Sequence, residues 1–258
     1  MQKNILWLVI FISLLCVTTS CSSPEEYDNY LENRGKSQYL FTYSIVTHSD
    51  ILNTQDEQEV KKDIQSTVQK AGGKLFGIWK PQVAETEATV GGIDLKHQLA
   101  KDNWVVILSW PREKNKELIR LAGTVLLDQK RINSVNVTRL LEPTVRPLGS
   151  QLTTGKGFIT IRWNKYKAEN VNKVIEFSSK AWVSFEEKYN TKVPGLWKDI
   201  TEPETKDGIS SLMRIAWYKE HEEWKRSRKF WKDPISLFYF FRRSQIELED
   251  KSYTVDFI

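Results

Sequence analysis

Two arginines stand at matching places in two segments with alternating apolar residues. The apolar members are Ile159, Ile161 and Trp163 in one segment and Met213, Ile215 and Trp217 in the other. Because successive side chains of a strand point to opposite faces, Arg162 and Arg214 lie on the other face. The planar guanidinium suits a carboxylate or a phosphate, so the pair predicts a site for an anionic ligand. The alternative is that both arginines pair with a structural Glu or lie at a wet strand edge.

His221 is the third candidate ligand-binding residue. It begins a predicted helix over residues 220–232, just after the segment that carries Arg214. Histidine titrates near neutral pH and can act as a ligand or a proton carrier. The alternative is an exposed histidine in the first turn of a helix.

A basic cluster, Lys225–Lys229, lies between Trp224 and the aromatic pair at 230–231. Basic residues interleaved with aromatic ones are typical of a nucleic-acid or membrane patch. The alternative is a solvated helix face.

Several kinds of chemistry are excluded by what the sequence lacks. Both cysteines, Cys16 and Cys21, fall within the first 21 positions, so the rest of the chain has no disulfide, thiolate metal site or cysteine nucleophile. Three scattered histidines make a metal site improbable, and there is no H-E-x-x-H, G-x-S-x-G or glycine-rich phosphate loop. No residue is identified as catalytic, and we favour binding over catalysis.

The N-terminus has the layout of an export signal. Lys3 is followed by an apolar run over residues 5–17, which is too short to span a bilayer comfortably as a helix. Residues 1–20 are therefore predicted to be a signal peptide, and residues 21–37 a polar tether.

Residues Thr18-Thr19-Ser20-Cys21-Ser22 resemble the lipobox of bacterial lipoproteins. The resemblance implies that Cys21 is acylated and begins the mature protein, and that Ser22 directs it to the outer membrane. Several acyl chains would anchor it firmly. The alternative is a plain cleavable signal with an incidental cysteine.

The composition is that of a globular protein, with 258 residues, 40% hydrophobic and 28% charged. The formal net charge is +5, and removal of residues 1–20 leaves +4. This excess could favour an anionic surface or ligand, but it is too small to indicate nucleic acid, which export also argues against.

The chain contains an internal duplication. Residues 40–80 pair without a gap with residues 158–198, at a displacement of 118, and eight of the 41 pairs are identical. After a longer connection in the first copy the displacement falls to 107, which pairs 105–110 with 212–217. At these displacements Ser44 and Ile107 are the counterparts of Arg162 and Arg214.

Each copy is predicted to contain strand, helix, strand, strand, helix and strand. The second helices are predicted over 113–130 and 220–232, and the last strands over 132–141 and 236–248. The repeats are placed at 38–142 and 157–258, joined by a Pro- and Gly-rich linker at 143–156.

This β-α-β-β-α-β order is the ferredoxin-like unit, and two such units can pack their open faces together. Residues 38–258 thereby resemble a fused pair from the dimeric α+β barrel superfamily, and in particular its NIPSNAP group. The likeness is carried by Gly157–Trp163, Ala181–Glu186, Pro194–Trp197 and Leu212–Ile215. The fold class expected is α+β, an intramolecular barrel of two repeats whose apolar strand faces lie under the helices while Arg162 and Arg214 face the lumen.

The leading functional hypothesis is a lipid-anchored envelope protein that binds a small anionic or amphipathic ligand, or a protein partner, without a cofactor. The resemblance also implies an alternative, because the superfamily includes haem-binding and haem-degrading enzymes and oxygenases. Arg162 or Arg214 would then hold haem propionates, and His221, where relatives often place a functional histidine, would lie near the iron.

Overall fold

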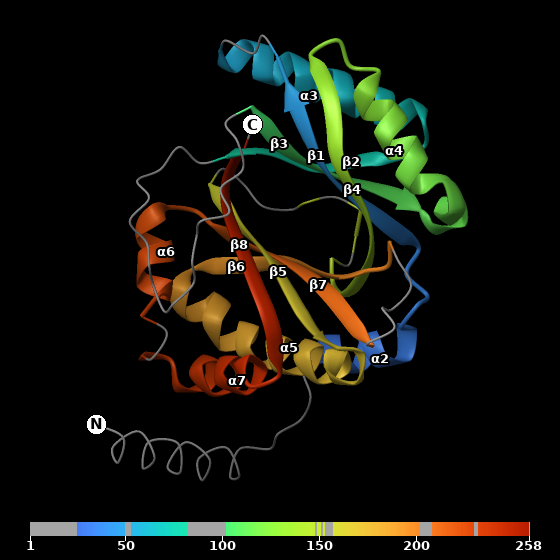
Figure 1. Cartoon of the computed structure of the whole chain (residues 1–258). Coiled ribbons are helices and arrows are strands. Elements are labelled where there is room, and N and C mark those ends of the chain that lie inside the picture. Colours follow the sequence, from blue (N-terminus) through green and yellow to red (C-terminus); the bar gives the residue numbers. More distant parts are fainter. Residues whose placement is uncertain are drawn as a thin grey trace.

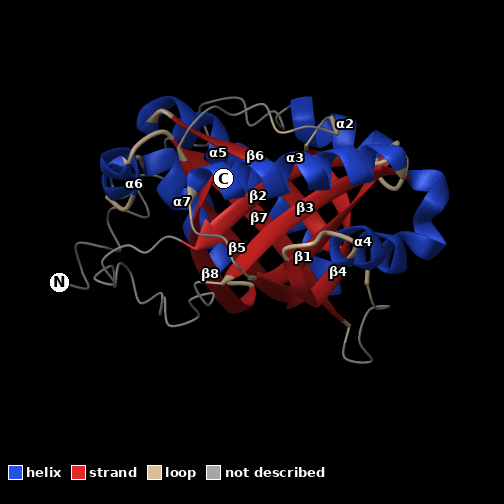
Figure 2. Ribbon diagram, turned by 90° about the horizontal axis from the view of Figure 1, so that it is seen from above, coloured by secondary structure: helices blue, strands red, loops and turns tan. Residues whose placement is uncertain are grey.

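The computed structural model describes residues 25–49, 53–81, 102–147, 149–150, 152, 157–201, 208–229 and 232–257. Eight strands form a closed barrel, and the helices lie outside it (Figures 1 and 2). The predicted signal peptide, Cys21 and residues 148, 151 and 153–156 of the predicted linker lie outside the described residues. No helix in the described ranges is long and apolar enough to cross a membrane.

The two repeats follow the predicted order of elements, except that the second has an additional helix before its last strand. The first consists of β1 (Tyr39–His48), α3 (Thr54–Lys70), β2 (Lys74–Pro81), β3 (Asn103–Pro111), the 3-10 turn η1 (Arg112–Glu117), α4 (Leu118–Leu127) and β4 (Ile132–Arg146). The second consists of β5 (Phe158–Lys167), the 3-10 turn η2 (Ala168–Asn170), α5 (Val171–Tyr189), β6 (Thr191–Asp199), β7 (Ile209–Tyr218), α6 (His221–Ser227), α7 (Pro234–Ser244) and β8 (Glu247–Phe257). The predicted α+β fold with two ferredoxin-like units is confirmed.

The barrel closes within one chain. Its strand order is β1-β3-β2-β8-β5-β7-β6-β4, so each repeat contributes four neighbouring strands. The two seams are the antiparallel pairs β2–β8 and β4–β6, in which Trp79 lies opposite Phe257 and Leu141 opposite Asp199. Hydrogen bonding along both seams leaves no free sheet edge.

The lumen is filled by apolar side chains from both repeats. Phe41, Phe76 and Trp197 pack edge to face there, with ring centroids 5.3 to 5.7 Å apart. The same cluster contains Tyr43, Trp79, Val105, Ile107, Leu141, Ile159, Ile161, Met213 and Ile215. The interior of the barrel is therefore a packed core, as is usual for an eight-stranded barrel.

Helices α3 and α4 cover the outer face of the first repeat, and α5, α6 and α7 that of the second (Figure 1). In α3 the buried residues are Val60, Ile64 and Val68, at helical spacing. The hydroxyl of the neighbouring Thr67 donates a hydrogen bond to the carbonyl of Asp63 at 2.9 Å.

Two helix predictions were wrong at their boundaries. The first, over 113–130, begins as an α-helix only at Leu118, because the charged run Arg112–Glu117 has no apolar side chain to bury and forms a 3-10 turn. The second, over 220–232, ends at Ser227.

The predicted strand over 236–248 is instead α7, followed by β8. Asp233 caps this helix by accepting a hydrogen bond from the backbone N–H of Ser236 at 3.2 Å, and Pro234 occupies its first turn. The aromatic run 238–241 favours strand by propensity, but the capping residues and contact with α5 determine the outcome.

The predicted tether contains a helix that is docked on the barrel. In α2 (Glu25–Asn33) the side chain of Tyr27 is buried, and its hydroxyl donates to the carbonyl of Asn172 at 3.2 Å. Glu26 pairs with Arg146 at 2.9 Å, and Arg146 also pairs with Glu186 at 2.5 Å. Since Arg146 ends β4, strand structure extends four residues into the segment predicted as a linker.

Candidate functional site

Arg162 and Arg214 are direct neighbours across two strands. In the antiparallel pair β5–β7, Arg162 lies opposite Arg214, as the prediction of adjacent strands requires. Two like charges so close together are unfavourable unless another group compensates them. The β5–β7 pair therefore holds two positive charges side by side, which repel each other.

The predicted face of the two arginines was wrong. Ile159, Ile161, Met213 and Ile215 belong to the core of the lumen, whereas Arg162 and Arg214 line a pocket on the outer face, under the helices of the second repeat. The lumen is closed, so the apolar side chains of each strand point into it. The charged side then faces the helix layer.

In the second part of each repeat, the structure aligns the two copies at a displacement one residue larger than the sequence predicted. Trp79 lies opposite Val105 in β2–β3, and Trp197 lies opposite Met213 in β6–β7, which gives a displacement of 108 rather than 107. The matching tryptophans at 110 and 217 misled the sequence alignment. The structural counterparts of Arg162 and Arg214 are therefore Ser44 and Val106, which are paired in β1–β3 and buried.

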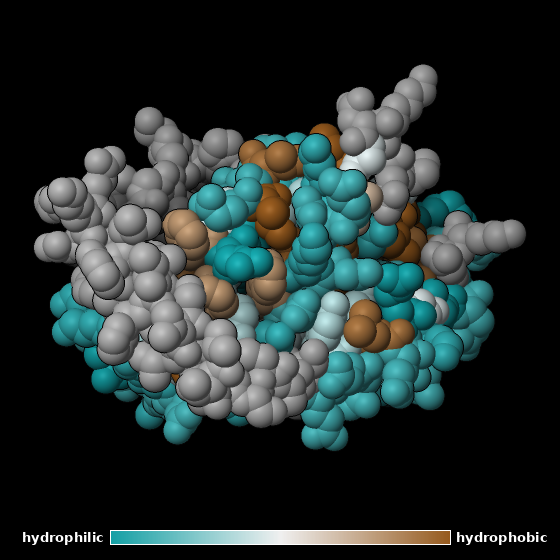
Figure 3. All heavy atoms as spheres, turned by 90° about the horizontal axis from the view of Figure 1, so that it is seen from below, coloured by the Kyte–Doolittle hydropathy of each residue, from teal (hydrophilic) through white to brown (hydrophobic). Residues whose placement is uncertain are grey.

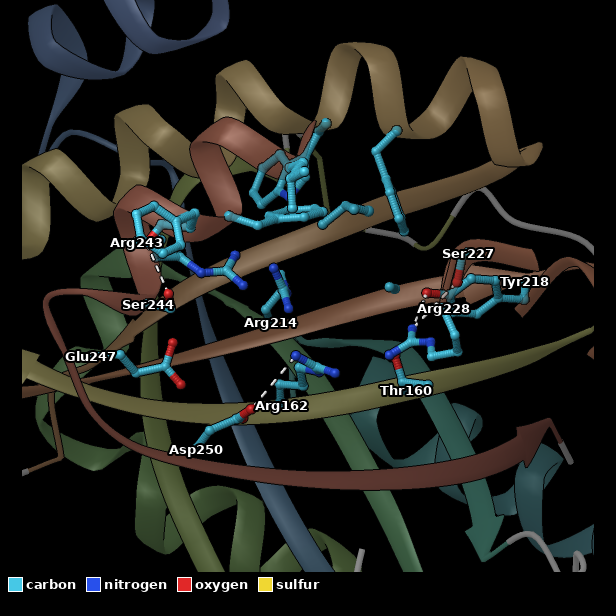
Figure 4. Close-up of a pocket in the computed structure, with 17 residues that line it drawn as sticks. Thr160, Arg162, Arg214, Tyr218, Ser227, Arg228, Arg243, Ser244, Glu247 and Asp250 are labelled. Carbon is cyan, nitrogen blue, oxygen red and sulfur yellow. Dashed lines mark hydrogen bonds and ion pairs between the residues drawn. The ribbon is translucent and has the colours of Figure 1, made fainter. Parts of the chain in front are cut away.

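The pocket has a volume of about 570 Å³ and lies between the sheet and helices α5, α6 and α7 (Figure 4). Four arginines line it: Arg162, Arg214, Arg228 and Arg243. The acids are Glu247 and Asp250, and the apolar wall includes Trp182, Phe185, Val193, Leu237 and Phe240. The lining thus combines an excess of two positive charges with a broad apolar surface.

Three of the arginines have a polar partner. Arg162 lies 3.6 Å from the carboxylate of Asp250. Arg228 donates to the hydroxyl of Tyr218 at 3.0 Å, and Arg243 donates weakly to the hydroxyl of Ser178 at 3.5 Å. The Nε atoms of Arg228 and Arg243 are buried without a hydrogen-bond partner.

Glu247 does not neutralise the pair on the sheet. Its carboxylate accepts hydrogen bonds from the Asn164 side chain at 2.8 Å and the Tyr166 hydroxyl at 3.4 Å. Both donors are neutral and come from β5. Glu247 is thereby held at the edge of the pocket.

Arg214 is the residue whose charge is least compensated. It is 9% exposed, and among the described residues it has no hydrogen-bond or ion-pair partner. Burial, followed by the charges of Arg243 and Arg162, lowers the pKa of its guanidinium well below the ordinary value. Burial and the charge of Arg228 lower the pKa of Arg162 as well, while Asp250 acts in the opposite direction.

His221 is not part of the pocket. It is the first residue of α6 and is exposed, and its ring lies tilted against those of Phe158 and Trp224 at centroid distances of 5.8 and 5.0 Å. The structure therefore brings together two of the three predicted ligand-binding residues and leaves out the third. Its position fits the alternative of an exposed first-turn histidine.

Sequence reasoning missed four charged residues of the pocket. Arg228 lies in the basic-aromatic cluster, which was considered only as a surface feature. Arg243, Glu247 and Asp250 belong to α7 and β8, where the secondary structure was predicted incorrectly. A correct α7, capped at Asp233, would have placed Arg243 on the side facing the sheet.

The described residues offer no metal centre. Within those ranges no group of three or more His, Cys, Asp or Glu side chains lies close enough to hold a metal ion. Any polar ligand of the pocket therefore meets mainly guanidinium groups.

Comparison with known proteins supports the fold. No family model matches the chain, and no curated protein matches it. A Lactobacillus acidophilus NCFM protein described as a candidate monooxygenase is 13% identical, with a TM-score of 0.52; the match covers 85% of this chain and 93% of that chain. An anthrone oxidase-like protein is 10% identical, with a TM-score of 0.53 and coverage of 86% and 92%.

A mutant chlorite dismutase from Candidatus Nitrospira defluvii is 8% identical, with a TM-score of 0.47 and coverage of 91% and 95%. The two structures with TM-scores above 0.5 share the fold of this chain over most of its length. Identities this low show the fold and leave the function to be argued from the site.

Replacing Arg214 with Met tests whether its charge is uncompensated. Met retains an unbranched chain and removes the buried cation, so we expect the free energy of unfolding to rise by about 1 to 4 kcal/mol. Urea denaturation measures the change. Arg120→Met, an exposed arginine on α4, is the control and is expected to leave stability unchanged. A loss of stability in R214M would show that Arg214 has a structural partner.

Proposed function

We propose that this chain binds a small anionic amphiphile in the pocket under α5, α6 and α7. The observation that carries the proposal is Arg214, a buried cation with no anionic partner among the described residues, directly beside Arg162. A bound carboxylate or phosphate supplies the missing negative charge. The apolar wall supplies a surface for the rest of the molecule.

The pocket favours an anionic head group over a neutral one. Figure 4 shows the side chains of Arg162, Arg214 and Arg243 converging on the same space. Guanidinium groups bind carboxylate and phosphate through parallel N–H donors, which gives direction as well as charge. The head group therefore belongs near the two strands.

The pocket also favours an apolar body. Trp182 and Phe185 of α5 and Phe240 of α7 line the side opposite the strands. A ligand that fills this part removes apolar surface from water, which is favourable in proportion to the area buried. A fully hydrophilic anion would leave these apolar side chains in contact with water.

A purely structural role for the arginines is the competing explanation. It accounts for Arg162, which has Asp250 at 3.6 Å, but not for Arg214. Removing a cation from water without a partner costs several kcal/mol. A bound anion would offset this cost and thereby account for a buried cation at this position.

An oxygenase-type or haem enzyme is the second candidate. Two structures that share the fold are described as a candidate monooxygenase and an anthrone oxidase-like protein. In this chain no histidine lines the described pocket, and His221 is exposed and lies against aromatic rings outside it. The residues therefore do not fit haem held by His221, and the arginines are better explained by a simpler anion.

The envelope location remains part of the proposal. It rests on the signal-like residues 1–20 and on Cys21 in its lipobox-like setting. The closer relationship to the NIPSNAP group rests on the W-x-x-F-E and G-L-W pieces of the second repeat. An anchored protein with an amphiphile pocket suits a membrane-derived ligand.

Dodecyl phosphate, used below its micelle-forming concentration, is the probe for the pocket. With residues 21–258 we expect it to raise the thermal midpoint, and dodecyltrimethylammonium to have no such effect. Calorimetry of Arg214→Met should show binding at least about tenfold weaker, the loss of one charged contact of about 1.4 kcal/mol. Arg120→Met should bind as wild type does. Equal binding of the cationic probe would contradict an anion site.

Haemin tests the second candidate. We expect no Soret shift when haemin is added at micromolar protein, because the pocket presents no histidine to the iron. A shift that His221→Ala abolishes would contradict the position assigned to this residue. A shift that survives His221→Ala and disappears in Tyr218→Phe would favour haem held by the tyrosine that lines the pocket.

Acylation of Cys21 is tested in cells fed a labelled fatty acid. We expect the wild-type chain to incorporate label and to fractionate with membranes. Cys21→Ala should lose the label, since it removes the thiol that would carry the lipid. Labelling that persists in Cys21→Ala would exclude the lipoprotein hypothesis and leave the pocket proposal intact.

A further inference from the structure

The two acids of the pocket are already engaged by other side chains. Asp250 lies beside Arg162, with the nearest oxygen and nitrogen 3.6 Å apart. The carboxylate of Glu247 accepts hydrogen bonds from two neutral side chains, those of Asn164 and Tyr166. Within the described part of the chain, neither acid forms an ion pair with another arginine of the pocket.

The other three pocket arginines therefore lack a carboxylate partner among the described residues. Arg214 has no polar partner there, while Arg228 and Arg243 contact hydroxyl groups and aromatic rings. An arginine side chain keeps its proton in proteins, so all three are cations. The one carboxylate of the lining that is not paired with an arginine is Glu247. The pocket thus lacks two negative charges rather than one.

The arginines approach the pocket from two sides. Arg162 and Arg214 come from the sheet, where they are paired across β5 and β7. Arg243 comes from the helix layer, and Figure 4 shows its guanidinium group pointing toward that of Arg214. A carboxylate presents its two oxygens in one plane, whereas a phosphate group presents three strong acceptor oxygens. A phosphate can therefore accept hydrogen bonds from the sheet and from α7 at the same time.

The rest of the pocket suits a long apolar chain. Phe241 and Ser244 line the pocket and are exposed, so the pocket reaches the surface beside the end of α7. Figure 3 shows the molecule from the side on which α7 lies, where apolar side chains are visible among polar ones. An alkyl chain can lie against Trp182 and Phe185 and continue toward the surface. A small soluble phosphate ester would leave these apolar side chains in water.

We propose that the ligand of this pocket is a lipid phosphate monoester in its doubly charged form, with the phosphate between Arg214 and Arg243. The proposal rests on the proposed function, binding of an anionic amphiphile, and narrows it to one class of head group. A phosphate monoester carries close to two negative charges at neutral pH, because its second pKa is about 6. A phosphate diester or a carboxylate carries one. The monoester alone supplies both missing charges.

The charge of the protein around the pocket stays constant where the monoester ionises. Besides the arginines, the titratable side chains that face this space are Tyr166, Tyr218, Glu247 and Asp250, and α5 lines it with uncharged side chains. Histidine is the side-chain type that ordinarily titrates between pH 5 and 8, and no histidine lines the described pocket. A change of affinity in this range therefore reports the charge of the ligand.

Calorimetry with dodecyl phosphate and with its methyl ester, dodecyl methyl phosphate, tests the charge of the head group. The protein is residues 21–258, which contain every described element, and both probes stay below their micelle-forming concentrations. At pH 7.5 we expect the monoester to bind at least about tenfold more tightly. At pH 5.0, where it is mostly singly charged, the two affinities should agree within about twofold. The diester should bind equally at both pH values.

Glycerol phosphate, a soluble monoester, tests the apolar part of the ligand. At pH 7.5 we expect it to bind at least about tenfold more weakly than dodecyl phosphate, because it buries no alkyl chain. Equal binding of the two would assign the pocket to a soluble phosphate ester and would overturn the lipid.

A variant of α7 tests the position of the phosphate. Arg243→Met removes one of the two uncompensated charges, so the preference for monoester over diester at pH 7.5 should fall to about threefold or less. Arg242→Met is the matched control and should keep the full preference, since Arg242 is exposed and lies over the ring of Phe177. Circular dichroism checks that both variants are folded.

The outcomes separate this proposal from the proposed function. Monoester and diester that bind equally at pH 7.5 would overturn the doubly charged ligand and leave an anionic amphiphile in place. If neither probe binds, both proposals are wrong. A preference that persists unchanged in folded Arg243→Met would overturn the placement of the phosphate against α7. The comparison of the two esters uses the unsubstituted chain and does not depend on the folding of any variant.

Discussion

Closure of the eight-stranded barrel is the constraint on which the rest of this structure depends. Once both seams are hydrogen-bonded, every strand has one face in a lumen without solvent, and alternation fixes which residues enter it. Phe41, Phe76 and Trp197 meet there from opposite repeats. A charged side chain on these strands has one place left, the layer between sheet and helices, and this is where Arg162 and Arg214 lie.

The two repeats use that layer differently. In the first, Ser44 and Val106 stand where the second has its two arginines, and α3 and α4 cover an apolar core. In the second, Arg243 of α7 is buried and lines the pocket, so the layer contains a cavity instead of a continuous core. Duplication supplies a stable barrel, and divergence of one copy supplies the site. In the first repeat the layer under the helices is a continuous apolar core, so this half of the barrel contributes stability.

Most of the fold could be predicted from the sequence because it depends on periodic apolar patterns that both copies share. The predicted strand pairing of Arg162 and Arg214 follows from the ferredoxin-like order and is confirmed. Their face could not be derived, because both sides of β5 and β7 carry buried apolar residues and only the closed lumen decides between them. Prediction of the site failed where local propensity and tertiary contact disagree. The aromatic run of α7 resembles a strand in its sequence. Helix α2 is short and depends for its stability on contacts with α5 and Arg146.

The size of the pocket limits what can compensate its charge. Its volume of about 570 Å³ is far more than a small inorganic anion occupies and falls in the range of small-molecule pockets. Such an ion would satisfy Arg214 and leave the wall formed by Trp182, Phe185 and Phe240 in contact with water. A purely apolar molecule would cover that wall and leave the cation unpaired. A molecule with an anionic head and an apolar body satisfies both requirements at once.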